Sequence, residues 1–536
     1  MGSKNWEIKL NVLHKRVEAF SQGYRQNVAL LGDDADEITY LLENYFYSVP
    51  PDGIVRIRAT TSCLGKNEFF RAIASSILTE YSCIGSSLDA LLNVASPAIP
   101  ATADFIKACL LKNNNTFLDC LEAINKLINE TGKKCILIID EFTNLPEIFN
   151  DFNSDFSKFI ILQNDCMILL TASHVKSAEK ILSGELNLLF GNFEKVSLNE
   201  NSFLKNATYL KNKIYPLNPS PCFISFFINI LGTNLMHYDI ISPYIKKYYS
   251  AENEDASILS ILTETLYTRE TYFYQHFIQK IKNLGYLFKD HTAILRLLLA
   301  MSQGYFRKKD LAALNIYDSK DLSLRLQKLL DANYIDNLGD IYKMKGSLFS
   351  FWLSQVFKFH FSTPIFSPAE NKRFFSESLK EEILNFREDF YTDKMKKVVQ
   401  LFSLFKNDTL RLGKNKYRLP SMEKVKLVSY PQKKFHLLVG EGREVVFAGV
   451  KETSVNENDL IDFIEKGQNV KGRGVRKIFI SLGKIPSTVK LIAKNNKIVA
   501  WDIDDINQIF NVYNRAILGY EFTSEYRIYA DENIMA

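Results

Sequence analysis

The 536-residue sequence contains no apolar run near the roughly 18 residues needed to cross a membrane. CFISFFINILG, from Cys222, is too short for that and predicts a buried helix. The opening MGSKNWEIKL lacks the apolar core of a signal peptide, and Trp6 stands where N-myristoylation needs Ser or Thr. The seven cysteines include no C-x-x-C pair, which favours reduced thiols. We therefore expect a cytoplasmic protein without a membrane partner.

Hydrophobic residues make up 46% of the chain, enough for a large core, and the length predicts about three domains. The net charge of +5 is unevenly distributed. Residues 371–500 contain 27 Lys and Arg against 15 Asp and Glu, a net charge of +12, so the rest of the chain carries −7. A basic segment is typical of polyanion binding, although a solvated lysine-rich surface has the same composition.

Three blocks of pattern follow one another along the chain. Up to about residue 215, the apolar runs NVALLG, GIVRIRAT, KKCILIIDEF and CMILLTAS alternate with helical patterns. This alternation predicts an α/β domain whose parallel sheet is covered by helices on both faces. Residues 216–360 are helical in pattern until IDNLGDIYKM, where strand, glycine turn and strand follow three short helices, as in a winged helix. Residues 375–536 predict a small mixed α/β domain.

The stretch ALLGDDADEIT, residues 29–39, follows the phosphate-binding pattern G-x-x-x-x-G-K-[ST] only in part. Gly32 and Thr39 match, whereas Glu37 and Ile38 replace the second glycine and the lysine. The loop also carries carboxylates at Asp33, Asp34, Asp36 and Glu37. Backbone N–H groups and the lysine bind phosphate in such loops, so four carboxylates should repel a triphosphate. The alternatives are acids that stabilise a helix N-terminus, or a bound cation.

The strand KKCILIIDEF ends in Asp140 and Glu141, about 100 residues after the glycine turn. In P-loop ATPases such residues hold Mg²⁺ and polarise the attacking water. The next strand ends near Thr171 and Ser173, where a sensor group would lie. Because phosphoryl transfer needs the lysine as well, we interpret the two acids as vestigial. ATP with Mg²⁺ is expected only if the altered loop still binds it, and no metal is expected otherwise.

The order of these motifs resembles the archaeal-type ATPases of the AAA/STAND class over nearly the whole chain. VSLNENSFLKNATYLKNKI and ILGTNLMHYDIISPYI resemble the lid of that family, with Gly232-Thr233-Asn234 in place of Gly-x-Pro. Fuller family members continue with a winged helix and a restriction-endonuclease-like domain. The resemblance implies four parts: a degenerate P-loop ATPase-like domain at 1–215, a helical lid at 216–290, a winged helix at 291–360, and a degenerate nuclease-like domain at 375–536.

Nuclease domains of this kind need an acidic residue on one strand and E-x-K on the next, to hold a metal ion and stabilise charge. In KFHLLVG and EVVFAGVKE, His436 and Gly449 stand at the acidic positions, and Lys451 matches the lysine. Lys396 stands where a helix glutamate is common, and Glu444 is a possible replacement. One histidine and one lysine do not form a metal site, so we interpret His436 and Lys451 as vestigial.

Two basic segments are candidate nucleic-acid contacts. The third helix of a winged helix enters the major groove, and here SKDLSLRLQKLL offers Lys320, Arg325 and Lys328. The segment KGRGVRK offers Lys471, Arg473, Arg476 and Lys477. Such a glycine-flanked basic loop contacts phosphates in some proteins and is a solvated connector in others.

The two altered sites together favour a noncatalytic DNA-binding or scaffold protein over an enzyme. One alternative is a divergent ATP-binding protein or ATP-dependent nuclease with relocated catalytic residues. Another is a protein-assembly factor that does not bind DNA, because residues 306–349 hold eight basic and six acidic residues and are only weakly basic. The expected partners are therefore DNA or a protein.

Overall fold

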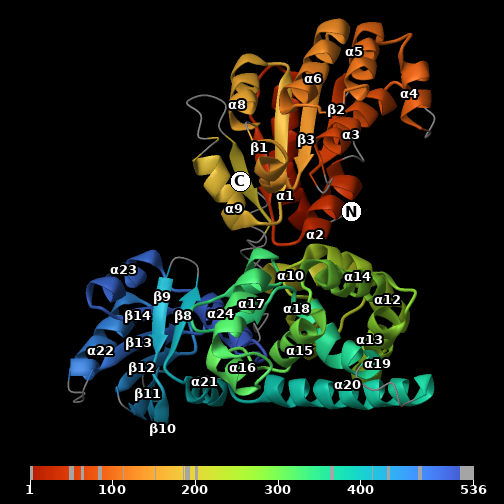
Figure 1. Ribbon diagram of the computed structural model, residues 1–536. Coiled ribbons are helices and arrows are strands. Elements are labelled where there is room, and N and C mark those ends of the chain that lie inside the picture. The colour runs from red at the N-terminus through yellow and green to blue at the C-terminus, as the bar shows by residue number, and fades with distance from the viewer. Residues whose placement is uncertain are drawn as a thin grey trace. The chain divides into compact units, whose positions relative to one another are not determined.

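The computed structural model describes residues 4–46, 53–61, 65–82, 87–112, 114–150, 152–184, 186, 193–198, 203–361, 367–412, 415–430, 435–442, 444–468 and 474–518. The chain divides into two compact units (Figure 1). The first extends to residue 201 and includes Asn234–Met236, and the second contains the remaining residues. No helix among the described residues is both long and apolar enough to cross a bilayer. The four-part division expected from the sequence stays a prediction.

A five-stranded parallel sheet forms the centre of the first unit, in the order β2-β3-β4-β1-β5. Its strands are β1 (Val28–Leu31), β2 (Ile54–Thr60), β3 (Lys134–Asp140), β4 (Cys166–Ala172) and β5 (Glu194–Ser197). The predicted α/β class with a P-loop NTPase-like parallel sheet is confirmed. The first four strands are the four predicted apolar runs. The edge strand β5 was not predicted, because Val196 is the only buried residue in its sequence EKVS.

The helices of this unit are α1 (Lys4–Ser21), α2 (Ala35–Leu41), α3 (Lys66–Thr79), α4 (Leu88–Ala95), α5 (Pro100–Leu110), α6 (Phe117–Thr131), α7 (Leu145–Ile148), α8 (Phe152–Leu162) and α9 (Val175–Ser183), with short turns at Leu42–Phe46 and Phe142–Asn144. Strand side chains alternate between the two faces of the sheet. One face, including Ile57, Leu137 and Leu170, forms a continuous core with α3, α5 and α6. Every residue of β4 is buried, so this strand is a continuous apolar run.

The second unit begins with helices α10 (Phe203–Ile214), α11 (Pro221–Leu231), α12 (Leu235–Tyr248), α13 (Glu254–Leu262), α14 (Tyr272–Leu287), α15 (His291–Ser302), α16 (Lys308–Ala313) and α17 (Ser319–Asp331). The antiparallel hairpin β6 (Ile335–Asn337) and β7 (Tyr342–Met344) follows. This order, three helices and then a hairpin, is the one predicted for residues 291–360. Next come α18 (Ser347–Trp352), α19 (Lys358–Phe361), α20 (Pro368–Tyr391) and α21 (Lys394–Ser403), with further helical turns at Thr263–Tyr267 and Leu353–Phe357.

The C-terminal part contains a second five-stranded sheet, in the order β10-β11-β12-β13-β14. Its elements are β10 (Met422–Tyr430), β11 (Phe435–Gly442), β12 (Val446–Lys451), α22 (Glu457–Gln468), β13 (Arg476–Ser481), α23 (Ser487–Asn495), β14 (Val499–Trp501) and α24 (Ile503–Val512). The first three strands are antiparallel and the last three are parallel, so the predicted mixed sheet is confirmed. One face packs on α21 and α24, and the other on α22 and α23. A separate hairpin, β8 (Asp408–Leu412) and β9 (Asn415–Leu419), was not predicted.

Candidate functional site

The segment that corresponds to a phosphate-binding loop is a capped helix start. Strand β1 ends at Leu31, and α2 begins at Ala35. Asp34 is its N-cap, and its side-chain Oδ1 accepts the N–H of Asp36 at 3.0 Å. The Asp34 carboxylate therefore satisfies a helix-end N–H group of the kind that a phosphate would otherwise bind, as the helix-capping interpretation predicts.

Glu37, at the position of the second loop glycine, is buried and contacts the protein itself. Its Oε1 accepts the backbone N–H of Leu235, the first residue of α12, at 2.9 Å. The side chain of Asn234 donates to Asp34 Oδ2 at 3.2 Å. A carboxylate at a helix N-terminus is favourable for the same reason as a bound phosphate. The loop thus carries its own anion, which binds residues from the segment that resembles the family lid.

Gly32 has a packing role in this arrangement. A Cβ atom there would lie 3.2 Å from Leu198 Cδ1 and 3.3 Å from Ile38 Cγ1. Ile38, at the lysine position, is itself buried. The glycine therefore allows close approach of apolar side chains, while Thr39 lines the adjacent cavity.

Asp140 is paired with an arginine that sequence reasoning missed. Arg58 Nε lies 2.5 Å from Asp140 Oδ2, and Thr171 Oγ1 donates to Asp140 Oδ1 at 3.1 Å. Arg58 also lies 3.3 Å from Glu43. Asp140 is 7% exposed, so its charge needs compensation inside the protein. A signal was present in the sequence, because GIVRIRAT places two arginines in an otherwise apolar strand.

Glu141 is held by the end of the neighbouring strand β4. Its carboxylate accepts the Ser173 N–H at 3.0 and 3.1 Å and the Ser173 hydroxyl at 3.0 Å. Burial raises the pKa of Glu141, against the opposing effect of the hydrogen bonds from Ser173. Its backbone is left-handed, with φ of 55°, a conformation uncommon for residues other than glycine. The structure therefore brings together the four polar strand-end residues that the sequence singled out, including Thr171.

A cavity of about 420 Å³ lies between these groups. Its charged lining consists of Arg58, Asp36, Asp140 and Glu141. One guanidinium faces three carboxyl groups, so the lining disfavours a triphosphate. A Mg²⁺ ion at Asp140 would have to displace Arg58, and no cluster suited to a metal ion occurs among the described residues. These residues do not fit a Mg-ATP site.

The proposed nuclease positions do not converge in the C-terminal sheet. In the β11–β12 pair, His436 is opposite Val450, and Leu437 is opposite Gly449. Directly paired residues share a face and neighbours along a strand alternate, so His436 lies on the face opposite to Gly449 and Lys451. The vestigial role given to His436 stays a prediction, and the residue of β11 that is paired with Gly449 is Leu437. His436 Nε2 lies 3.3 Å from Glu452 instead.

Lys451 forms an ion pair at a helix start. Its Nζ lies 2.5 Å from Asp459 Oδ2, and Asp459 also accepts the N–H of Asn456 at 2.9 Å. Glu444, the possible replacement ligand, pairs with Arg476 at 2.5 Å. The hydrogen bond from Arg476 lowers the pKa of Glu444. Lys396 is exposed in the first turn of α21. Lys451 and Glu444 are thus each bound to another side chain of the protein.

The candidate nucleic-acid residues differ in accessibility. Lys320 and Lys328 are exposed on α17, whereas Arg325 Nε lies 3.0 Å from Asp290 Oδ2. Arg476 is engaged by Glu444, as described above, and the side chain of Lys477 is half-buried. Lys471 and Arg473 lie outside the described residues.

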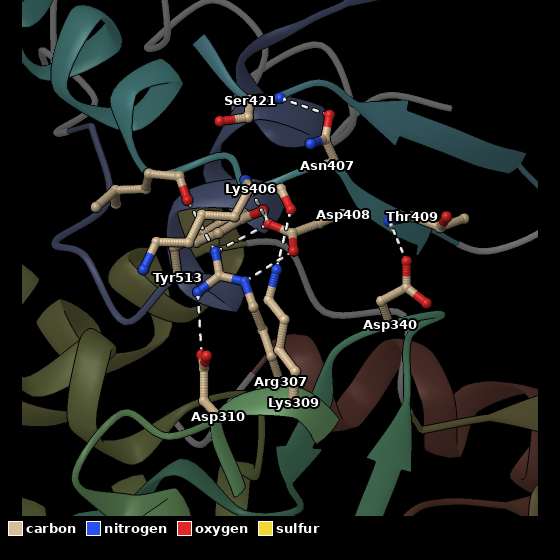
Figure 2. Close-up of polar contacts among 11 residues, drawn as sticks. Arg307, Lys309, Asp310, Asp340, Lys406, Asn407, Asp408, Thr409, Ser421 and Tyr513 are labelled. Carbon is tan, nitrogen blue, oxygen red and sulfur yellow. Dashed lines mark hydrogen bonds and ion pairs between the residues drawn. The ribbon is translucent and has the colours of Figure 1, made fainter. Parts of the chain in front are cut away.

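The tip of the β6–β7 hairpin is bound to β8 (Figure 2). The N–H of Asp340 donates to the Thr409 carbonyl at 2.9 Å, and the Thr409 N–H donates to the Asp340 carboxylate at 2.7 Å. Gly339, directly before Asp340, has φ of 101°, and a Cβ atom at this position would lie 2.2 Å from the carbonyl oxygen of Thr409. Only glycine allows this contact.

A buried ion pair lies beside the hairpin contact (Figure 2). Arg307 Nε and Nη2 bind the two carboxylate oxygens of Asp408 at 2.7 and 2.9 Å, and the Tyr513 hydroxyl donates to Asp408 at 2.9 Å. Burial alone would raise the pKa of Asp408, but the hydrogen bonds from Arg307, the Lys406 N–H and Tyr513 hold it below its ordinary value. The helices before the hairpin are thereby joined to β8 and the end of α24.

Comparisons with known proteins find structural similarity only. A scan against protein-family models finds no match, and neither does a search of curated proteins. The Walker-type ATPase PABY2304 of Pyrococcus abyssi is 15% identical, with a TM-score of 0.43 over 65% of this chain and 95% of that one. The Aeropyrum pernix ORC2 protein (ADPNP-ADP complexes) is 10% identical, with a TM-score of 0.36 over 72% of this chain and 96% of that one.

The Aeropyrum pernix ORC1 protein in complex with DNA is also 10% identical, with a TM-score of 0.36 over 66% of this chain and 93% of that one. At these identities and TM-scores, the similarities establish neither an activity nor a partner for this chain.

Replacing Arg58 should destabilise the first unit. Arg58→Met leaves the buried Asp140 carboxylate without its cation, which we expect to lower the free energy of unfolding by about 3 kcal/mol. The double variant Arg58→Met/Asp140→Asn should recover most of that loss, because no buried charge remains. Urea unfolding at pH 7 measures both effects. Arg56→Met, on the same strand, is the matched control, and an equal loss there would contradict the role given to Arg58.

The C-terminal sheet should not cut DNA. Lys451 is ion-paired with Asp459, and the pair Gly449 and Leu437 on the same face of the sheet offers no carboxylate. Plasmid incubated with the protein and Mg²⁺ or Mn²⁺ should stay intact by gel electrophoresis. Cleavage by the wild type that disappears in Lys451→Ala and is also absent from a mock preparation would show that an active site exists there.

Proposed function

We propose that the chain is a noncatalytic nucleic-acid-binding scaffold. In this proposal, the P-loop NTPase-like unit has lost ATP hydrolysis, residues 291–360 are a winged helix, and residues 375–536 are a nuclease-like domain without its active site. One observation carries the proposal: the Asp140 carboxylate is paired with Arg58 at 2.5 Å.

ATP hydrolysis needs free loop N–H groups, a lysine and a metal ion acting together. In this chain, Asp34 caps the loop helix, Ile38 replaces the lysine, and Arg58 takes the carboxylate on which a metal ion would depend. Glu37 adds a buried carboxylate that binds the Leu235 N–H. Each group that hydrolysis requires is therefore either missing or already bound to another part of the protein. Relocating a single residue would not restore the chemistry.

The charge of the C-terminal part supports nucleic acid as the partner. The +12 segment at 371–500 and the exposed lysines 320 and 328 offer positive charge. Lysine acts on phosphate mainly as a point charge, so binding should be salt-sensitive and similar across sequences. The hairpin tip is engaged by β8, so α17 and the basic C-terminal segments are the surfaces that we assign to nucleic acid.

A protein-assembly factor is the second candidate, and two contacts favour it. The hairpin tip is covered by β8, and Arg325 is paired with Asp290. A winged helix with its wing and one recognition arginine engaged has fewer groups left for DNA. The third alternative, an enzyme with relocated residues, has less support, because Glu444 is held by Arg476 and Arg418.

Mg-ATP should not bind in the manner of a P-loop ATPase. Isothermal titration calorimetry with millimolar Mg-ATP should show no saturable binding, because the carboxylates of the loop and cavity repel the triphosphate. Asp140→Ala is the diagnostic variant, since it removes the residue that a nucleotide-bound metal would use. Saturable binding by the wild type that is lost in Asp140→Ala would contradict the proposal.

DNA should bind weakly and with a steep salt dependence. Fluorescence anisotropy over a salt series should show similar affinity for unrelated duplexes. Neutralising Lys320 and Lys328 to Gln should reduce the slope of log K against log salt by about one to two, as expected for the loss of one or two phosphate contacts. Neutralising Lys471 and Arg473 in the same way tests the second segment.

Lys107→Gln/Lys176→Gln is the matched control, because both lysines are exposed in the first unit and the change in net charge is the same. The slope should not change in this control. If the slope falls equally in all three double variants, the cause is a general effect of net charge. If the wild type does not bind even at low salt, the assembly-factor candidate replaces the DNA-binding one.

A further inference from the structure

The second unit contains a polar cavity that the proposed function does not use. Its volume is about 410 Å³, and residues from α11, α15, β7, α18, α19, α20 and α24 line it. Hydroxyl and amide groups dominate one part of the lining, among them Asn229, Ser347, Ser350, Ser354, Ser378 and Asn514. The volume lies within the range of small-molecule pockets, about 300–1,000 Å³, and such a lining suits a hydrogen-bonding ligand.

Lys343 of β7 places an ammonium group at the wall of this cavity. Its Nζ donates to the backbone carbonyl of Asn511 and, at 2.7 Å, to the Asn511 side-chain oxygen. Both acceptors are neutral, and no ion pair joins Lys343 to a carboxylate among the residues that the structure describes. Burial lowers the pKa of Lys343 to about 7, against the opposing effect of Asp336 across the hairpin.

The other charged groups of the lining leave the cavity positive or neutral. Lys358 contributes a second ammonium group. Among the described residues of the lining, Glu382 has the one carboxyl group, and burial together with the neighbouring Glu381 raises its pKa. Lys343 is half-buried and donates to neutral acceptors, so a ligand that brings negative charge would stabilise its ammonium group. A cationic ligand would add to the positive charge of the two lysines, and a neutral ligand would leave Lys343 with the neutral acceptors of Asn511.

We propose that this cavity binds a small organic molecule through an oxyanion group, a phosphate, sulfate or carboxylate, placed at Lys343 and Lys358. The volume exceeds that of an inorganic ion, and the serine and asparagine groups provide hydrogen bonds for the remainder of the ligand. The site is separate from the first unit and does not depend on the proposed function. The elements around it come from the helices, the hairpin and the C-terminal segment, so an occupant contacts all three.

The site has a defined pH dependence. The titratable groups that line the cavity with Lys343 include Tyr342 from its own strand, Lys358 from α19 and Glu382 from α20. Asp336 of β6 is paired with Lys343 across the hairpin, and α24 contributes the neutral Asn511. An oxyanion binds the protonated lysine. Below pH 7 most Lys343 is already protonated, but above pH 7 binding must take up a proton. Affinity should therefore fall as pH rises, by up to about tenfold per pH unit.

Sulfate is the probe, because it does not titrate between pH 6 and 9. Calorimetry of the full chain at constant ionic strength should give binding at pH 6.0 that is at least tenfold tighter than at pH 8.5. At pH 8.0 the binding enthalpy should vary with the ionisation enthalpy of the buffer, which reports proton uptake. Acetate, titrated in parallel, distinguishes a tetrahedral oxyanion from a carboxylate as the preferred group.

Lys343→Met keeps the length of the side chain and removes its charge, so sulfate binding should weaken at least tenfold at pH 6.0 and proton uptake should disappear. Lys107→Met, an exposed lysine of the first unit, should bind sulfate like the wild type. The proposal is overturned if the wild type does not bind either probe at pH 6.0, or if Lys343→Met binds as well as the wild type. If that variant does not fold, a wild-type affinity that stays constant from pH 6.0 to 8.5 overturns it equally.

Discussion

A carboxylate buried at the end of a parallel strand needs a positive charge beside it, and in the first unit Arg58 supplies that charge to Asp140. The pair lies 2.5 Å apart at the edge of the sheet where polar strand ends meet. The neighbouring carboxylates Glu141 and Glu37 likewise accept hydrogen bonds from groups of the protein itself. Glu141 accepts from Ser173, and Glu37 accepts from Leu235. The edge is therefore held by protein groups in positions where a nucleotide and its metal ion would be needed.

The second unit meets the same constraint in the same way. Asp408 is buried, and Arg307 binds both of its oxygens, with Tyr513 as a third donor. The cost of burying the carboxylate is offset by this geometry, and removal of either partner would leave an uncompensated charge. Because Arg307 precedes α16 and Asp408 begins β8, the pair fixes the helices before the hairpin to the C-terminal part. The hairpin tip then binds β8 through backbone groups, which limits what this surface offers to a partner.

The sequence predicted the helices and strands better than it predicted the functional sites. Four of the five strands of the first sheet follow from apolar runs, and three of them, β1, β3 and β4, are buried on both faces, where such runs are needed. The edge strand β5 and the β8–β9 hairpin were missed, since short strands with polar residues carry no such pattern. The loss of the phosphate-binding lysine was visible at Ile38. The ion pair between Arg58 and Asp140 was not predicted, because it depends on strands β2 and β3 becoming neighbours.

The sequence by itself determined the residue types available at each strand end, the absence of the loop lysine and the excess of positive charge at 371–500. Local composition and periodicity fix these properties. The tertiary structure alone decided which charges meet. It placed His436 and Lys451 on opposite faces of one sheet, although they lie on adjacent strands. It also placed Lys343 beside a polar cavity, where its hydrogen-bond acceptors on Asn511 are neutral. The face on which a side chain lies and the residues beside it depend on strand register and on packing between distant segments. A register shift of one residue moves the side chain to the other face of the sheet.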